Sequence, residues 1–153
     1  MQELLQRAEE HFFAGRIHIA LKLFEHIKAK DPENYLATTY SADIYAMQKK
    51  YAEAVDNYKI ALDLSPAPYQ EHFRLGQVYY LQRKADPARD AFQEALRARP
   101  ELAECHYYLG LIYLRFDNDR EKAKAAFTLY LQARPEAKER LQIETLLQPG
   151  NTP

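Results

Sequence analysis

The spacing of four prolines constrains the fold of this chain more than any other feature of its sequence. They recur every 34 or 35 residues, at Pro32, Pro66, Pro100 and Pro135. A fixed period of this length is the signature of a repeat protein, in which each unit is one supersecondary element. Proline disfavours the helical conformation in the residue before it and lacks an N–H donor, so each proline is predicted to follow the end of a helix. The chain is therefore expected to contain four repeated units.

Composition indicates what each unit is made of. Glycine occurs only 4 times and proline 8 times in 153 residues. Ala, Leu, Glu, Gln, Lys and Arg dominate instead, and these residues lose little side-chain freedom in a helix. Apolar residues recur at three and four positions, and no stretch alternates apolar with polar residues as a half-buried strand would. These patterns predict an all-α protein whose units are pairs of antiparallel helices.

Shifting the sequence by one period aligns further columns of similar residues, two of them small and two largely aromatic. The columns are Ala8, Ala42, Gly76, Gly110; Ala20, Ala54, Ala88, Ala123; His11, Tyr45, Tyr79, Tyr113; and Phe24, Tyr58, Phe92, Phe127. The small columns, one in each helix of the pair, are expected to face each other and let the helix axes approach closely. The aromatic columns are too bulky for one pair to bury, so successive pairs are expected to stack into a continuous core.

Two local signals refine the expected helix boundaries. The fourth unit is one residue longer than the others, and its columns place the extra residue between Phe116 and Asp119, in the turn between its two helices. Asp86 followed by Pro87 is typical of a helix start, with aspartate as the N-cap and proline at the first helical position. This dipeptide therefore predicts the beginning of the second helix of the third unit.

On these residues the chain resembles the tetratricopeptide repeat (TPR) family. The third and fourth units are closest to its pattern of small, aromatic and proline positions, with Leu75, Gly76, Tyr79, Ala88, Phe92, Ala95, Pro100 and with Leu109, Gly110, Tyr113, Ala123, Phe127, Pro135. The first unit departs from the pattern, because Arg7 and His11 stand where leucine and tyrosine are usual. The resemblance implies a solenoid of helical hairpins that winds into a right-handed superhelix.

The resemblance also implies a domain organisation. A single TPR domain would span residues 1–148, and residues 149–153 would form a flexible tail. The repeats would cover residues 1–34, 35–68, 69–102 and 103–137, followed by a capping helix at 138–148.

No motif for catalysis or for a cofactor stands out in the sequence. It has no glycine-rich phosphate loop, no paired cysteines and no Gly-x-Ser-x-Gly. His72 and His106 share a column, but equivalent side chains of stacked repeats point in parallel, so they are not expected to meet on one metal ion. The single cysteine, Cys105, is expected to be packed and inert. We therefore predict a protein that is not an enzyme and that has neither a metal nor a cofactor.

Charge and hydropathy narrow the classes of partner. The chain has 21 Lys and Arg against 22 Asp and Glu, a net charge of -1, so it lacks the basic surplus typical of nucleic-acid binding. It has no apolar run long enough to cross a membrane and no N-terminal secretory pattern. We expect no nucleic-acid partner, no membrane insertion and a cytoplasmic location.

In TPR proteins the first helices of the repeats line a concave groove, and the resemblance therefore implies a set of partner-binding residues. They are Leu5, Glu9, Phe12, Thr39, Asp43, Phe73, Gln77, Tyr80, Tyr107, Leu111 and Leu114, with Met47 and Leu81 at the edge. The second half of this groove is apolar, and a large apolar patch is unusual on a soluble protein unless a partner covers it. We predict a protein or peptide partner with apolar anchors for this half and a basic residue for Glu9 and Asp43.

Several alternatives remain open at this stage. Phe73 and Tyr107 have core packing as their alternative role. The carboxylate clamp with which some TPR proteins hold acidic chaperone tails is disfavoured, because Leu5 and Glu9 stand where it needs lysine and asparagine. Size and groove also suit a class II chaperone of bacterial type III secretion. The last alternative is a scaffold that associates with itself into a homo-oligomer.

Overall fold

The computed structural model of the protein describes residues 1–148, and within this range it consists of helices and short turns without a strand. The helices are α1 (Gln2–Phe13), α2 (Ile17–Lys30), α3 (Tyr35–Met47), α4 (Tyr51–Leu64), α5 (Tyr69–Leu81), α6 (Ala85–Ala98), α7 (Ala103–Arg115), α8 (Arg120–Ala133) and α9 (Arg140–Leu146). The all-α prediction is confirmed. The tail expected at residues 149–153 lies outside the described residues.

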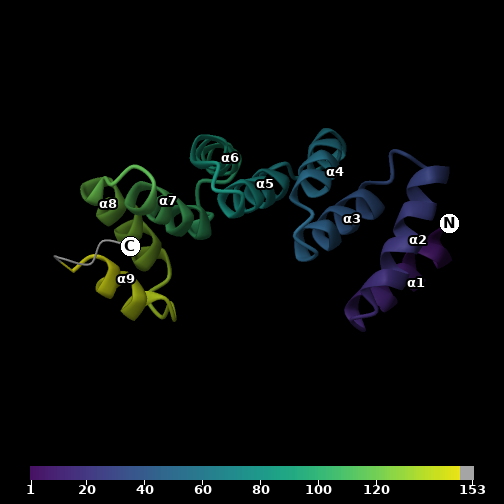
Figure 1. Cartoon of the computed structure of the whole chain (residues 1–153), viewed down its shortest axis with the longest axis horizontal. Coiled ribbons are helices and arrows are strands. Elements are labelled where there is room, and N and C mark those ends of the chain that lie inside the picture. Colours follow the sequence, from purple (N-terminus) through teal and green to yellow (C-terminus); the bar gives the residue numbers. More distant parts are fainter. Residues whose placement is uncertain (149–153) are drawn as a thin grey trace.

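The first eight helices form four hairpins that follow one another along an elongated array (Figure 1). Within the hairpins α1 packs on α2, α3 on α4, α5 on α6 and α7 on α8. Successive hairpins are joined by contacts of α2 with α3, α4 with α5 and α6 with α7. Each hairpin thus packs on its neighbours in the sequence, which is the arrangement of a helical-repeat solenoid. The predicted fold class is confirmed.

The prolines of the repeat act as predicted, whereas the N-cap predicted for α6 is wrong. The second helices end at residues 30, 64, 98 and 133, in each case two residues before the proline of their unit. Helix α6 begins at Ala85, and its N-cap position is held by Lys84. Asp86 lies inside the first turn, where it accepts a hydrogen bond of 2.6 Å from Arg89. The turn that precedes α6, which has the same geometry in the earlier hairpins, sets the start of this helix.

One residue with a left-handed backbone closes the turn inside each of the first three hairpins. These residues are Gly15, Lys49 and Arg83, with φ of 73°, 60° and 59°. The N–H of the residue after each of them donates to the carbonyl five residues earlier, as in a Schellman turn. In the fourth hairpin the N–H of Asp119 reaches back six residues, to the carbonyl of Tyr113. The extra residue of this unit therefore lies in the turn where the sequence placed it.

A large side chain from each second helix fills the space between its own hairpin and the next. Phe24, Phe92 and Phe127 are completely buried. The ring of Phe24 stacks on Tyr40 of the following hairpin with centroids 4.9 Å apart, and Phe92 stacks on Tyr108 at 5.0 Å. Both pairs join residues 16 positions apart. The core is therefore a series of equivalent junctions between hairpins.

Helix α9 continues this series at the C-terminal end. Ile143 stands 16 positions after Phe127, and the two residues are buried in the same apolar cluster. The Tyr130 hydroxyl donates to Glu139 just before α9, at 2.8 Å, and Arg120 donates to the carbonyl of Gln148 just after it, also at 2.8 Å. Helix α9 is thus held against α8 and covers the last hairpin as the first helix of another unit would.

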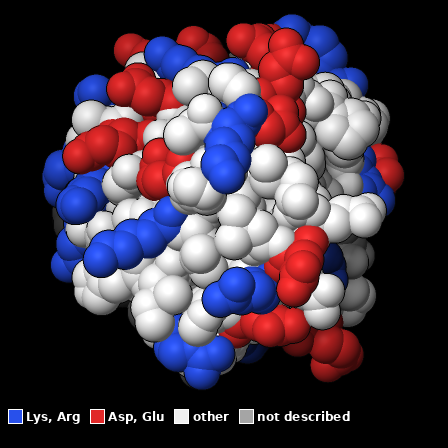
Figure 2. All heavy atoms as spheres, turned by 90° about the vertical axis from the view of Figure 1, so that its right-hand side faces the viewer, with Lys and Arg blue, Asp and Glu red and all other residues white. Residues whose placement is uncertain are grey.

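The N-terminal end has a polar outer face instead. Arg7 is exposed at a position where the third and fourth units carry leucine. Gln6 is exposed at a position where the second and fourth units carry tyrosine. Figure 2 views this end of the molecule and shows acidic and basic side chains spread over the face, with uncharged surface between them. The departure of the first unit from the TPR pattern therefore coincides with side chains that face solvent.

Gly76 and Gly110 stand where a first helix meets the aromatic ring of its own hairpin. A Cβ atom added to Gly76 would lie 2.7 Å from the ring of Phe92, and one added to Gly110 would lie 2.7 Å from Phe127. The nearest atoms in both cases belong to these rings, so the small column of the first helices makes room for the aromatic column. The sequence predicts that the small column of the first helices faces the alanine column of the second helices. The alanine column alone does not explain why the first helices need glycine, because the nearest atoms belong to the rings.

We predict that Gly76→Ala destabilises the protein although alanine favours helices. Overpacking in a core costs about 1–3 kcal/mol, whereas the gain in helix propensity is about 1 kcal/mol. Urea unfolding followed by circular dichroism should give a lower midpoint for the variant. In a Phe92→Leu background, which lacks the ring, the same change should raise the midpoint. A Gly76→Ala variant as stable as the parent would contradict the contact.

Candidate functional site

Two adjoining hollows lie in the middle of the array, on the side formed by the first helices. The central hollow, about 450 Å³, is lined by Asp43, Tyr58, Tyr69, Gln70, Phe73, Arg74, Gln77 and Leu102. The rim hollow, about 380 Å³, is lined by Ala46, Met47, Tyr58, Arg74, Gln77, Val78, Tyr80, Leu81 and Tyr108. Helices α3 and α5 therefore supply most of both linings, and three residues, Tyr58, Arg74 and Gln77, belong to both.

A polar network forms the floor shared by the hollows. One Arg74 nitrogen donates to both carboxylate oxygens of Asp43 at 2.6 Å, and the Tyr58 hydroxyl donates to the same carboxylate at 2.5 Å. Burial, followed by the negative charge of Asp43, raises the pKa of Tyr58 well above its usual range. Arg74 compensates the charge of Asp43, so this carboxylate is less available to the basic partner residue that the sequence predicts for it.

This network replaces the ring stack of the neighbouring junctions. Tyr58 and Arg74 are 16 positions apart and stand in the columns that hold Phe92 and Tyr108 one unit later. A partly buried guanidinium is stabilised by a carboxylate, whereas an aromatic ring at the same place needs only apolar contacts. Asp43 provides the carboxylate for Arg74. The junction between the second and third hairpins is therefore the polar one, and both hollows open there.

Three of the predicted groove residues are buried and leave little surface for a partner to contact. Thr39, Leu111 and Leu114 expose only 7%, 5% and 3% of their surface. Leu111 and Leu114 share an apolar cluster with Ile143, so α9 covers the groove of the fourth unit. Thr39 lies in the middle of α3, which packs on both α2 and α4.

Three of the four predicted aromatic residues, Phe73, Tyr80 and Tyr107, are half-buried and meet on Tyr108. Ring centroids of Phe73, Tyr80 and Tyr107 lie 5.8, 5.7 and 5.6 Å from that of Tyr108. Phe73 lines the central hollow and Tyr80 the rim hollow, whereas Tyr107 lines neither and lies 5.3 Å from Tyr130. Core contacts thus account for part of the surface of all three residues.

The remaining predicted residues divide between the first hairpin and the hollows. Leu5 and Phe12 pack on the apolar cluster of the first hairpin, and the ring of Phe12 lies 5.1 Å from Tyr40. Glu9 lies near the same ring. Burial raises the pKa of Tyr40, and the negative charge of Glu9 raises it further. Gln77 lines both hollows and donates to the Tyr108 hydroxyl at 3.0 Å.

The partner-binding set predicted from the sequence left out five lining residues of the central hollow, which are Tyr58, Tyr69, Gln70, Arg74 and Leu102. Tyr58 and Arg74 carried a readable signal, since they put polar groups into columns that are aromatic in the neighbouring units. Tyr69, whose hydroxyl accepts a hydrogen bond of 2.5 Å from Arg99, and Leu102 lie at the starts of α5 and α7. They gave no such signal, because Tyr69 only repeats the tyrosine of the preceding unit, Tyr35, and the column of Leu102 shares no residue type.

The described residues show neither a cluster of metal ligands nor an exposed thiol. Within residues 1–148 no three or more His, Cys, Asp or Glu side chains gather as a metal site would require. Cys105 is completely buried, and burial, followed by the charge of Glu104, raises the pKa of its thiol to about 12. No helix between Gln2 and Leu146 has both the length and the apolar character needed to traverse a bilayer.

Comparison with known families identifies the class of protein. Three family models of the tetratricopeptide repeat match this sequence, at residues 5–69, 69–102 and 104–137. These matches cover most of the chain, which therefore belongs to the tetratricopeptide repeat family, as its resemblance indicated. The fold of this family implies a protein–protein interaction module. A comparison with curated proteins finds no match.

Solved structures with the same fold include several TPR proteins. MamA of Desulfovibrio magneticus RS-1, from residue 41 to its end, superposes with a TM-score of 0.80 at 20% identity, over 90% of this chain and 77% of that one. A thermophilic TPR protein of Thermus thermophilus gives 0.75 at 20% identity, over 94% and 79%. A TPR protein of Parabacteroides merdae gives 0.84 at 21% identity, over 95% and 58%. At these identities the likeness establishes the fold.

We predict that the thiol of Cys105 is inert in the native protein. A pKa of about 12, against about 8.5 for a free thiol, lowers the thiolate fraction at mildly alkaline pH by about a thousandfold. The rate of reaction with a coloured disulfide reagent should therefore be very low and should rise steeply in denaturant. A native rate equal to the denatured one would contradict the burial of this side chain.

We also predict that Asp43 and Arg74 are energetically coupled. Their side chains are 24% and 32% exposed, so a double-mutant cycle with Asp43→Asn and Arg74→Gln should give about 1 kcal/mol. Urea unfolding of the four proteins measures it. Arg97 and Glu94, an exposed pair on one helix, serve as the control and should couple by about 0.3–0.5 kcal/mol. Equal coupling in the two cycles would argue against the network.

Proposed function

We propose that this protein is a non-catalytic interaction module that binds a peptide segment or a protein surface across the central and rim hollows. The observation that carries the proposal is the apolar rim of these hollows. Met47 and Leu81 line the rim hollow and still expose 60% and 55% of their surface. Phe73 and Tyr80 add half-buried aromatic surface. In this proposal residues 1–148 act as one TPR domain.

The rim hollow suits a large apolar side chain of a partner. Its volume of about 380 Å³ falls at the lower end of the range of about 300–1,000 Å³ that is usual for ligand pockets. Met47 and Leu81 flank it, and Tyr80 and Tyr108 complete its lining. Aromatic and apolar anchors that fill such a hollow lose their contact with water, and residues of this kind dominate the energetics of most interfaces.

The central hollow offers polar groups that fix the position of a bound chain. Gln70 is exposed on its lining, and Gln77 and Arg74 lie between it and the rim hollow. The bonds of Arg74 to Asp43 hold the guanidinium in place before a partner arrives, which lowers the entropic cost of binding. A partner backbone would therefore lie along α5 and place its apolar side chain at the rim.

A paired substitution of the rim tests this proposal. The double variant Met47→Ala/Leu81→Ala should weaken partner binding by about tenfold or more, equivalent to about 1.4 kcal/mol. Both side chains are more than half exposed, so thermal stability should change little. The partner is captured from native cell extract on the immobilised parent protein, and its affinity for parent and variant is then measured by calorimetry.

Ile60→Ala is the matched control, because Ile60 is an equally apolar residue of α4 that is 48% exposed and lines neither hollow. This control should bind like the parent. Binding of the rim variant at parental affinity, or an equal loss in Ile60→Ala, would refute the site.

A further inference from the structure

In each of the first three units, one exposed apolar side chain stands at the end of the first helix. Phe13, Met47 and Leu81 are the last residues of α1, α3 and α5, and they expose 74%, 60% and 55% of their surface. Single exposed apolar residues are normal on a soluble protein. Three at equivalent positions of successive units form a row instead, and such an arrangement is typical of an interaction surface.

Every charged side chain in the turns that follow these residues is a cation. The turns at residues 14–16, 48–50 and 82–84 contain no Asp or Glu, and their exposed cations are Arg16, Lys49, Lys50, Arg83 and Lys84. None of the five forms an ion pair within the described part of the chain. We call these five cations and the three apolar residues of the row the turn surface. Its charge contrasts with the net charge of -1 of the whole chain.

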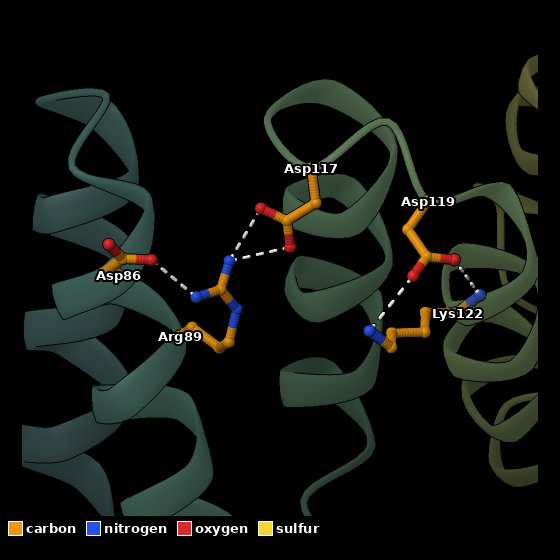
Figure 3. Close-up of polar contacts among 5 residues, drawn as sticks. All are labelled: Asp86, Arg89, Asp117, Asp119 and Lys122. Carbon is orange, nitrogen blue, oxygen red and sulfur yellow. Dashed lines mark hydrogen bonds and ion pairs between the residues drawn. The ribbon is translucent and has the colours of Figure 1, made fainter.

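The fourth turn ends this surface, because its charged residues are acidic and already paired. Figure 3 shows Arg89 of α6 between Asp86 and Asp117, and Lys122 of α8 beside Asp119. One Arg89 nitrogen donates to both oxygens of Asp117 at 2.8 and 2.7 Å, and Lys122 lies 3.1 Å from Asp119. The carboxylates of the fourth turn are therefore matched by their own cations.

The rim hollow lies between two units of the turn surface and contains no carboxylate. Met47 and Leu81 line it, and the only charged side chain in its lining is that of Arg74, which is bonded to Asp43. The cations of two turns follow Met47 and Leu81 within three residues. An apolar side chain that enters the hollow thus carries its chain neighbours toward positive charge.

We propose that the turn surface binds an acidic segment of a partner protein in which large apolar side chains lie between aspartates or glutamates. This inference rests on the proposed function and names the chemistry of its partner. The apolar side chain occupies the rim hollow, and the carboxylates on either side of it face Lys49 and Lys84. The apolar contact supplies most of the affinity, while the exposed cations select an acidic sequence and speed its association. A hollow that receives single side chains fits a polypeptide better than the flat surface of a lipid bilayer.

Two labelled peptides test the inference with the full chain. One is a short fluorescein-labelled peptide in which glutamates flank two leucines, and the other has lysine in place of each glutamate. Fluorescence anisotropy should show that the acidic peptide binds at least about tenfold more tightly and that added salt weakens it. The double variant Lys49→Glu/Lys84→Glu should lose about tenfold in affinity for it.

Lys22→Glu/Lys59→Glu is the matched control, because it has the same net charge and both lysines are exposed on second helices away from the turns. It should bind the acidic peptide like the parent. Equal losses in the two double variants, equal binding of the two peptides, or no binding of the acidic peptide would overturn the inference.

The rim variant separates failure of the inference from failure of the proposed function. Preference for the lysine peptide, abolished by Met47→Ala/Leu81→Ala, would leave the hollows as the binding site and reject the acidic partner. If both peptides bind and Met47→Ala/Leu81→Ala does not change their affinity, the proposed function and the inference are both rejected. Co-sedimentation with phosphatidylserine vesicles that Lys49→Glu/Lys84→Glu abolishes would also overturn the inference, in favour of a lipid surface.

Discussion

The contact of a buried second-helix side chain with the first helix of the following hairpin holds this molecule together. A hairpin alone would leave this side chain exposed, so each hairpin needs its neighbour. The contact recurs at a spacing of 16 residues, from Phe24 to Tyr40 and from Phe92 to Tyr108. Ile143 takes the same place after Phe127, which explains why α9 covers the last hairpin. The glycine at the centre of α5 and of α7 exists because this ring also presses on its own first helix.

The candidate site arises where this contact changes its chemistry. At the junction of the second and third hairpins, Tyr58 and Arg74 stand where the next unit has Phe92 and Tyr108, and they are joined through Asp43 by hydrogen bonds of 2.5 and 2.6 Å. Both hollows open at this junction. Tyr58 and Arg74 line both hollows. The same two residues therefore affect the stability of the junction and the space available to a partner.

The sequence was sufficient for the fold and insufficient for the site, for one physical reason. The prolines and the small and aromatic columns report contacts that recur in every unit, so periodicity reveals them. The burial of Leu111 under α9 and the pairing of Asp43 with Arg74, 31 residues away, each occur once. A groove assigned column by column therefore treats positions as equivalent although their neighbours differ. Met47 and Leu81 were placed correctly at the edge, because the last residue of a first helix has the same surroundings in successive units.

The turns provide an independent reason to assign a role to their cations. Each of the first three turns is closed by hydrogen bonds between backbone atoms, so its fold does not require a particular side chain. At the position with φ near 60°, glycine is the residue with the least steric conflict, and Gly15 occupies it in the first unit. Lys49 and Arg83 occupy it in the next two, where a side chain adds backbone strain and no ion pair offsets it. The Arg83 guanidinium lies 5.6 Å from the centroid of the Phe116 ring, whereas Lys49 has no comparable contact among the described residues. At Lys49, strain retained without a structural benefit points to a function of the side chain. Lys49 stands two residues after Met47, which lines the rim hollow, and an acidic partner bound there would place its charge near this side chain.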